Sequence, residues 1–510
     1  MPGVCLVADA LNLSMFRAYD IRTPSPLLTD ELAVRLARAE ARYFREVLGV
    51  AGVVVAHDAR LTGPRRLSLA AEVYLDAGLD VVAVPGVSST CLLYFTAMKH
   101  PHYAAVMFGA SHNPKDDTGQ KILGANLQPI ARNIGPEGGL ESVKALYLAD
   151  ESCRGARRGR LTACDALDEY VEYSSSLAGV VPGSLAGLRV LHDYLNGAAG
   201  REMRLAFEQA GAELTALHFA ADGTFPLGDP NPVKESVTRE GRELLRLGAF
   251  DLATLFDGDG DRLDFYVGDG TYVASSFVYA AILPLLRGRF PEDNWGVFAD
   301  LKSNPLAIME MARTGVRVEV IRNGHSQIKQ SMIDDPTMFG TVEESAHFYE
   351  AFQFGGSGLR FCTENSLYIA LLVSRAFHEQ PDRIRHLLQL QATTSREREW
   401  GYKFPSDRAR AEAMDAVEAH FTSLGAASMK TMSNGMDLEA TLLRRGLPFR
   451  IGPNTRLADD WLQVCQRISQ SEDGLARWEA VSANARLART AKADIARIVQ
   501  DYGASTEYQG

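Results

Sequence analysis

Residues 53–78 read VVVAHDARLTGPRRLSLAAEVYLDAG. The apolar run 53–56 is typical of a buried strand, and the polar residues 58–62 predict a loop directly after it. Residues 64–77 have the spacing of a helix, with a proline at the first position and Gly78 just past the end. The stretch therefore predicts a strand–loop–helix unit of the kind that builds α/β layers.

The same unit recurs along most of the chain. Further strands are predicted at 81–84, 104–108, 188–192, 252–256, 296–299 and 316–321, and further helices end at Gln209 and span 305–314. Alternating strands and helices predict mixed or parallel sheets. Because the alternation restarts twice, we predict an α/β fold with three similar mixed-sheet domains.

From about residue 390 the pattern changes. Residues 409–424 are typical of a helix, 438–443 of a strand and 461–468 of another regular segment, and the Ala- and Arg-rich stretch 474–502 predicts a helix. We therefore predict a smaller C-terminal α+β domain. The chain is too long for one core, and the four predicted domains are 1–165, 166–265, 266–388 and 389–510.

The composition argues against several classes of protein. The chain has 510 residues, of which 46% are hydrophobic, and its formal net charge of −11 argues against a general nucleic-acid surface. No run of about 18 apolar residues is present, so we expect no membrane partner, and the N-terminus has no signal-peptide pattern. The scattered cysteines form no CxxC pair, which favours a reducing cytoplasm; they are Cys5, Cys91, Cys153, Cys164, Cys362 and Cys465.

A serine lies just after the strand predicted at 104–108, in the sequence Ala110-Ser111-His112-Asn113-Pro114. A serine hydroxyl is a poor nucleophile unless a base, a cation or an attached phosphate activates it. The carboxyl end of a strand is where α/β sheets bind ligands, so Ser111 is a candidate carrier of a covalent phosphate. The alternative is a turn serine that bonds a local backbone amide.

Three carboxylates alternate with glycines in Asp257-Gly258-Asp259-Gly260-Asp261-Arg262. This spacing lets oxygen ligands converge on one hard cation such as Mg²⁺. An EF-hand loop is excluded, because its sixth position would be Arg262 and its twelfth Gly268. A solvated acidic turn is the alternative, but an apolar strand leads directly into the loop.

The order of seven motifs resembles the α-D-phosphohexomutase family, which includes phosphomannomutase and phosphoglucomutase. The motifs are 16–22 (FRAYDIR), 57–60 (HDAR), 110–114 (ASHNP) with 119–121 (GQK), 222–226 (DGTFP) with 230–232 (PNP), 257–262 (DGDGDR), Gly324-His325 with Lys329, and 343–347 (EESAH). Any one of them would be weak evidence, whereas seven in order are specific.

The resemblance implies a heart-shaped, four-domain enzyme with a central active site. Ser111 would carry a phosphate, and Asp257, Asp259 and Asp261 would hold one Mg²⁺ together with that phosphoserine. The phosphate would pass to a hexose phosphate, giving a hexose bisphosphate that reorients and returns its other phosphate, so that phosphate moves between C1 and C6. Such reorientation without escape leads us to expect closure of the fourth domain.

The resemblance also implies roles for other side chains. Arg22, Lys121 and Arg262 would surround the reacting oxygens, and Lys121 or His347 would act as general acid and base, with His112 and His325 behind them. The predicted substrate-binding residues are Tyr19, Lys302, His325, Glu343, Ser345, Arg450, Asn454 and Thr455. The expected partner is a small sugar phosphate, and the expected state is a monomer or homodimer.

The sequence departs from the family pattern around substrate recognition. The family's Arg-Pro-Ser-(Gly/Asn)-Thr loop is matched only by 450–456 (RIGPNTR), which lacks the serine and places Arg450 one residue too far upstream. Thr23, Val342 and the Asp117-Thr118 pair also differ from the common residues. A mannose or glucose phosphate is the first prediction for the substrate. The alternatives are an amino-sugar phosphate, a sugar phosphate of a specialised pathway, a phosphatase, and a non-catalytic relative.

Overall fold

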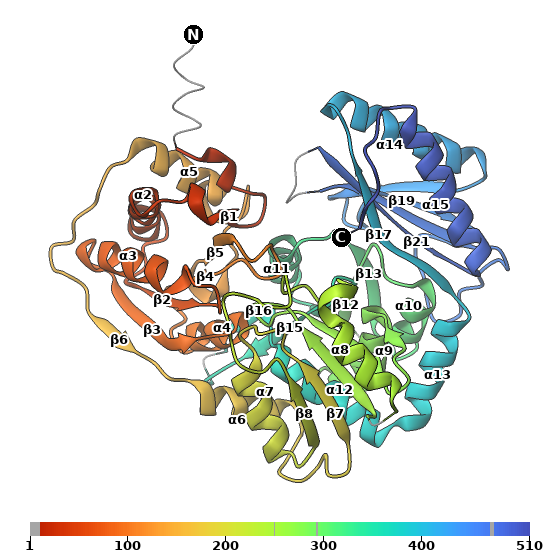
Figure 1. The fold of residues 1–510 in the computed structure, drawn as a ribbon, viewed down its shortest axis with the longest axis horizontal. Coiled ribbons are helices and arrows are strands. Elements are labelled where there is room, and N and C mark those ends of the chain that lie inside the picture. The colour runs from red at the N-terminus through yellow and green to blue at the C-terminus, as the bar shows by residue number, and fades with distance from the viewer. Residues whose placement is uncertain (1–10, 249, 292–293, 357, 470–473, 510) are drawn as a thin grey trace. The chain divides into compact units, whose positions relative to one another are not determined.

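The computed structural model describes residues 11–509 except 249, 292–293, 357 and 470–473 (Figure 1). The chain forms two compact units. The first contains the residues up to 272 with 325–334 and 348–378, and the second contains 273–324, 335–347 and the residues from 379 onward.

The first unit begins with a six-stranded mixed sheet. Its strand order is β1 (Ile21–Pro24), β5 (Asp117–Leu123), β4 (Ala104–Phe108), β2 (Gly52–His57), β3 (Asp80–Val87) and β6 (Leu161–Ala163). Strands β4, β2, β3 and β6 are parallel, whereas β5 runs antiparallel to both β4 and β1. The strands predicted at 53–56, 81–84 and 104–108 are confirmed.

The helices of this sheet are α2 (Asp30–Arg42), α3 (Gly63–Asp76), α4 (Thr90–Met98) and α5 (Leu140–Ala149). Helix α3 confirms the helix predicted after the 58–62 loop, and it has a proline in its first turn as expected. Val53, Val55 and Val106 of the sheet are fully buried in one core with Tyr74 of α3. Burial of this apolar surface holds the helices on the strands.

A second mixed sheet follows, and all of it except Val273 belongs to the same unit. Its order is β11 (Tyr272–Val273), β10 (Leu263–Val267), β9 (Leu252–Phe256), β7 (Arg189–Asp193) and β8 (Glu213–Leu217). The accompanying helices are α6 (Leu167–Ala178), α7 (Gly200–Gln209) and α8 (Glu235–Arg246). Strand β7 is parallel to β8 and β9, and β10 returns antiparallel to β9, so the aspartate loop 257–262 closes a hairpin.

Four more elements belong to the first unit in whole or for the most part. They are α11 (His325–Asp334), β15 (His347–Gln353), β16 (Arg360–Glu364) and α12 (Ser366–Glu379). Strands β15 and β16 are antiparallel.

In the second unit, β12 (Gly296–Asp300) lies between β13 (Arg317–Ile321) and β14 (Met338–Glu343) and is parallel to both. The helices α9 (Ser275–Arg287), α10 (Pro305–Ala312) and α13 (Pro381–Ala392) pack together in this region. These elements confirm the strand and helix alternation predicted for a third α/β region.

The C-terminal part of the second unit is an antiparallel sheet. Its order is β18 (Ala427–Thr431), β19 (Asp437–Arg445), β20 (Leu462–Ile468), β21 (Leu475–Ser482), β17 (Ser395–Lys403) and β22 (Tyr508–Gln509), with helices α14 (Asp407–Ser423) and α15 (Ala485–Gln500). A core around Trp400, Trp478 and Ile495 joins the sheet to the helices. The predicted combination of mixed-sheet α/β domains and a C-terminal α+β domain is confirmed.

One predicted element is wrong. Residues 474–502 do not form a single helix, because 475–482 form β21 in the interior of the C-terminal sheet. Pairing with β17 and β20 on either side buries Trp478 and the backbone polar groups of this strand, and that tertiary pairing outweighs the helical composition. The helix predicted there is confined to α15.

Two findings bear on the expectations about membranes and cysteines. Among the described residues, no helix is long and apolar enough to cross a membrane. Cys91, Cys153, Cys164, Cys362 and Cys465 are free thiols, and Cys5 lies outside the described residues. The limits proposed for the four domains stay a prediction.

Candidate active site

The Ser111 loop, residues 109–116, connects the carboxyl end of β4 to β5 in the first unit. The Ser111 side chain is 2% exposed, and its Oγ donates a hydrogen bond of 2.6 Å to Oδ2 of Asp257. His112 Nδ1 lies 3.3 Å from the same hydroxyl. Ser111 has a φ of 49°, a left-handed conformation that costs a non-glycine residue about 1–2 kcal/mol. The serine is therefore held in a strained loop against a carboxylate, unlike an ordinary turn serine.

Two neighbouring strands, β1 and β5, bring basic side chains to the region of this serine. Arg22 of β1 pairs with Gly119 of β5, and Lys121 of β5 pairs with Met107 of β4, just before the Ser111 loop. Arg22 donates to the carbonyl of Ala110 at 2.6 Å and also to the Asn113 side chain. Register in one sheet thus explains why motifs about 90 residues apart meet.

Lys121 contacts the aspartate loop directly. Its ammonium lies 2.7 Å from Oδ2 of Asp259 and 2.5 Å from Oδ2 of Asp261. Burial alone would lower the pKa of Lys121, but the two carboxylates hold it above its ordinary value. Lys121 is therefore protonated in this structure.

The aspartate loop fits a hard cation. Asp257, Asp259 and Asp261 are all buried, and their ligand oxygens lie within 4.8 Å of one another. Burial, followed by the charges of Asp259 and Asp261, raises the pKa of Asp257 well above its ordinary value. Oδ1 of Asp259 is buried and has no hydrogen-bond partner among the described residues. Three buried carboxylates that converge in this way offer the oxygen ligands that a divalent cation prefers.

Helix α4 supports this loop, a contact that the sequence analysis missed. Thr90, at the first position of α4, donates from Oγ1 to Asp259 Oδ2 at 2.6 Å and from its backbone N–H to the Asp259 carbonyl at 2.9 Å. Ser89 caps the helix by accepting the N–H of Leu92. The Ser-Thr pair before an apolar run is a recognisable N-cap signal, but its target cannot be read from sequence.

Three further predicted residues lie in the first unit. The backbone N–H of Arg262 donates to Asp257 Oδ1 at 3.2 Å, and its guanidinium lies 3.8 Å from Oδ2 of the same residue. The rings of Tyr19 and His325 contact each other edge to face, with centroids 5.8 Å apart. Arg262 therefore contacts the aspartate loop, and Tyr19 contacts the Gly324-His325 motif through the His325 ring.

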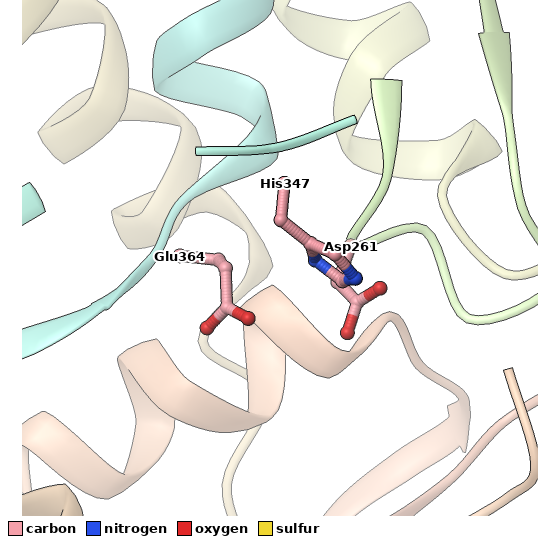
Figure 2. Close-up of side chains that lie close together, drawn as sticks. All are labelled: Asp261, His347 and Glu364. Carbon is pink, nitrogen blue, oxygen red and sulfur yellow. The ribbon is translucent and has the colours of Figure 1, made fainter. Parts of the chain in front are cut away.

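A buried ion pair between Lys329 and Glu364 lies close to Asp261. Lys329 of α11 lies 2.6 Å from Glu364 at the end of β16, and its ammonium is 4.2 Å from the centre of the Tyr94 ring. Figure 2 shows the Glu364 and Asp261 carboxylates close together, and their oxygens lie within 4.8 Å. Burial raises the pKa of Glu364, and the Lys329 charge opposes that shift. Lys329 was part of a predicted motif, whereas no sequence signal pointed to Glu364.

The remaining predicted residues belong to the second unit or to its boundary. Glu343 ends β14 and accepts a hydrogen bond from the Asn323 amide at 3.2 Å, and Ser345 is half-buried in the following turn. Ala346 in that turn has a φ of 70°. His347, the first residue of β15, is buried.

Lys302 is more enclosed than a ligand-contacting lysine would need to be. It is 5% exposed and lies 3.8 Å from Asp300 and 3.7 Å from Glu399. Glu399 in turn pairs with Arg467 at 2.7 Å and Arg477 at 2.6 Å. The charge of Lys302 is therefore already shared by two carboxylates, and its predicted contact with substrate stays a prediction.

The irregular loop 450–456 closes on itself. The N–H of Gly452 donates to Oγ1 of Thr455 at 2.8 Å, and the N–H of Thr455 returns to the Gly452 carbonyl at 3.2 Å. Arg450 instead lines a cavity of about 380 Å³ with Lys430 and side chains of β13 and β18. Of these two residues, Arg450 is the better candidate for binding an anion, because it lines a cavity. The Thr455 hydroxyl is already hydrogen-bonded within the turn.

The protein resembles known proteins in both sequence and fold. Residues 13–136 match the family described as phosphoglucomutase/phosphomannomutase, alpha/beta/alpha domain I, and residues 168–270 match domain II. A phosphomannomutase of Escherichia coli is 28% identical over 386 residues, which are 71% of this chain and 81% of that protein. These matches support a relationship of the chain to the α-D-phosphohexomutase family.

Solved structures share the fold of this chain. A phosphoglucomutase/phosphomannomutase family protein from Burkholderia thailandensis has a TM-score of 0.75 at 21% identity, covering 96% of this chain and 98% of its own. An Aspergillus fumigatus N-acetylphosphoglucosamine mutase, in complex with GlcNAc-6P and magnesium, has a TM-score of 0.54 at 11% identity, covering 99% of this chain and all of its own.

Proposed function

We propose that this protein transfers phosphate between C1 and C6 of a hexose phosphate, through a phosphoserine at Ser111 and a hexose bisphosphate. The observation that carries the proposal is the 2.6 Å hydrogen bond from the Ser111 hydroxyl to Asp257, within a buried cluster of three aspartates. A turn serine has no need of such surroundings, whereas a serine that accepts and releases phosphate needs a cation and basic groups beside it.

The proposed roles of the side chains follow from their chemistry. Asp257, Asp259 and Asp261 would hold Mg²⁺, which when bound neutralises charge on the transferring group. Arg22 and Arg262 would bind phosphate oxygens, since a guanidinium group can donate two parallel, charge-assisted hydrogen bonds to a phosphate. Lys121, whose ammonium lies beside Asp259 and Asp261, and His347 are the candidates for general acid and base. In the transfer, the bond from Ser111 Oγ to phosphorus breaks as a sugar oxygen bonds to phosphorus. The proton of the sugar hydroxyl would pass to the general base, and Ser111 Oγ would take a proton from the general acid.

The substrate is proposed as a small sugar phosphate. The relative from Escherichia coli is named a phosphomannomutase, and the sequence EESAH at 343–347 favours mannose or glucose phosphate. The Aspergillus fumigatus structure holds GlcNAc-6P and magnesium, which keeps an amino-sugar phosphate as the second candidate. Tyr19, Lys302, His325, Glu343, Ser345, Arg450, Asn454 and Thr455 are the residues proposed to bind it.

Intact-mass measurement of the purified protein tests the covalent route. After incubation with glucose 1,6-bisphosphate and Mg²⁺, we expect one added phosphate in the wild type and none in Ser111→Ala. Ser68→Ala, an exposed serine of α3, is the control and should keep the phosphate. An unmodified wild-type protein after this incubation would contradict the proposal.

The substrate is identified by a panel of hexose 1-phosphates with Mg²⁺, each followed for hexose 6-phosphate and for inorganic phosphate. A mutase converts one sugar phosphate into the other at constant total phosphate ester. Release of inorganic phosphate at the rate of substrate consumption would instead identify a phosphatase.

A further inference from the structure

Two of the sequence motifs have no part in the proposed chemistry. They are the HDAR segment at 57–60 and the DGTFP segment at 222–226, which lie about 165 residues apart in the sequence. Both belong to the first unit, and both contact the region behind the Ser111 loop.

Arg60 binds the backbone of the Ser111 loop at four points. Its Nη2 donates to the carbonyls of Ser111 at 2.9 Å and Asn113 at 2.8 Å, and its Nη1 donates to those of Pro114 at 2.6 Å and Asp117 at 2.9 Å. The Arg60 side chain is 2% exposed. One rigid guanidinium group therefore fixes four backbone carbonyls between Ser111 and Asp117.

Asp58 holds the start of the same loop. Its Oδ2 accepts the N–H of Ala110 at 3.1 Å, and its Oδ1 accepts the N–H of Arg60 at 2.9 Å. A side chain at Gly109 would place its Cβ 2.3 Å from Oδ2 of Asp58, so this approach requires glycine there. Asp58 and Arg60 thus bind the two ends of the peptide that carries Ser111.

The DGTFP segment packs against the other side of Arg60. The guanidinium carbon lies 5.5 Å from the centre of the Phe225 ring, and Phe225 is 1% exposed. A Cβ at Gly223 would lie 2.3 Å from the carbonyl oxygen of Ala59, so the two segments are in direct contact. Phe225 therefore leaves the guanidinium little room to move away from the loop.

We propose that Arg60 is a positioning residue for phosphoryl transfer, which holds the Ser111 loop in its left-handed conformation and is itself held by Asp58 and Phe225. The proposal rests on the proposed function of Ser111. Without the four hydrogen bonds, the loop is expected to relax, and the Ser111 hydroxyl loses its alignment with Asp257. Lysine cannot replace the arginine, because an ammonium cannot bond four carbonyls in this fork geometry.

The test compares Arg60→Lys with Arg66→Lys in the full chain. Arg66 is the matched control, since it is also a buried arginine of the first domain, but its guanidinium binds Asp30 and the Leu28 carbonyl. We expect Arg60→Lys to lower kcat at least 20-fold and the extent of Ser111 phosphorylation by glucose 1,6-bisphosphate, with KM changed less than threefold. Arg66→Lys should keep kcat within about threefold of the wild type.

Hydrogen exchange followed by mass spectrometry supplies a readout that needs no enzyme activity. Amides in the 109–117 segment should exchange at least tenfold faster in Arg60→Lys than in the wild type, and Arg66→Lys should leave them unchanged. If the 109–117 amides exchange faster in Arg60→Lys but the wild type lacks mutase activity, the positioning role of Arg60 is supported and the proposed function fails. If the wild type is an active mutase but Arg60→Lys keeps its kcat and the protection of its loop amides, the positioning role of Arg60 fails alone.

Phe225→Leu decides the question if Arg60→Lys does not fold. This variant keeps apolar volume and leaves every Arg60 hydrogen bond available, so we expect a three- to tenfold lower kcat and faster exchange at 109–117. A wild-type kcat with unchanged exchange in folded Phe225→Leu would overturn the proposed role of this segment.

Discussion

Glu40 of α2 is a carboxylic acid in the core of the first domain. It is fully buried, and Tyr74 of α3 donates a hydrogen bond to it at 2.5 Å. Burial raises the pKa of Glu40 to about 8, and the Tyr74 hydrogen bond only partly opposes that shift. Glu40 is therefore neutral at pH 7, where an exposed glutamate would be ionised.

Because the folded-state pKa lies above the unfolded one, the contribution of Glu40 to stability is complete below about pH 4.5 and falls as the pH rises to about 8. The expected slope is about 1.4 kcal/mol per pH unit across this window. Urea unfolding of the wild type and Glu40→Gln between pH 5 and 8 measures this slope. As the pH rises, the free energy of unfolding of the variant should increase steadily relative to that of the wild type. Glu31→Gln, at the exposed start of the same helix, is the control and should show no such trend. If the free energies of unfolding of the wild type and Glu40→Gln changed equally with pH, the assignment of a neutral Glu40 would be wrong.

At the scale of one element, helix α4 supports the aspartate loop. Thr90 gives two hydrogen bonds to Asp259, one from its side chain and one from its backbone N–H. Groups that orient metal ligands in this way typically contribute about 10- to 100-fold to metal affinity. We expect Thr90→Val, which keeps the shape of the side chain, to weaken Mg²⁺ binding about tenfold in isothermal titration calorimetry.

Thr96→Val is the matched control, because Thr96 is buried in the same helix but donates to the Leu92 carbonyl within that helix. It should leave Mg²⁺ affinity unchanged. Equal losses of affinity in both variants would mean that the helix as a whole, and not the Thr90 contact, supports the loop.

At the scale of the whole molecule, the second unit is joined internally by buried charges. Arg396 of β17 lies 2.6 Å from Glu344 in the turn after β14 and 2.5 Å from Glu479 of β21. This arginine links the β12–β14 region to the C-terminal sheet, and both belong to one compact unit. We therefore expect the C-terminal sheet to move together with β12–β14, and the closure of the fourth domain expected from the sequence stays a prediction.

Removal of Arg396 leaves two buried glutamates without their shared partner. A change that breaks a buried ion pair typically costs about 3–5 kcal/mol, so Arg396→Met should lower the free energy of unfolding of the second unit by about that amount. Thermal and urea unfolding measure the effect. Arg408→Met removes an exposed pair with Glu412 and should cost less than about 1 kcal/mol. A loss of similar size in both variants would show that the buried network does not join the two parts.

The sequence alone determined the fold class and the succession of strands and helices in the α/β regions, and it supplied the residues proposed to carry the chemistry. Short apolar runs, prolines and glycines are local signals, so the strand at 53–56, the helix after it and the aspartate loop were all predictable. The stretch 474–482 was misassigned, because its strand depends on two partners that are distant or unrecognised in the sequence.

The tertiary structure decided which of these residues support one another. Register between β1, β5 and β4 brings Arg22 and Lys121 to Ser111, and hydrogen bonds from Arg60 hold the Ser111 loop. Thr90, Glu364 and Arg396 could not be found from sequence, since a buried charge or hydroxyl acquires its role only from partners that folding supplies. Sequence patterns report local preference, whereas burial and contact across distant segments depend on the complete packing of the chain.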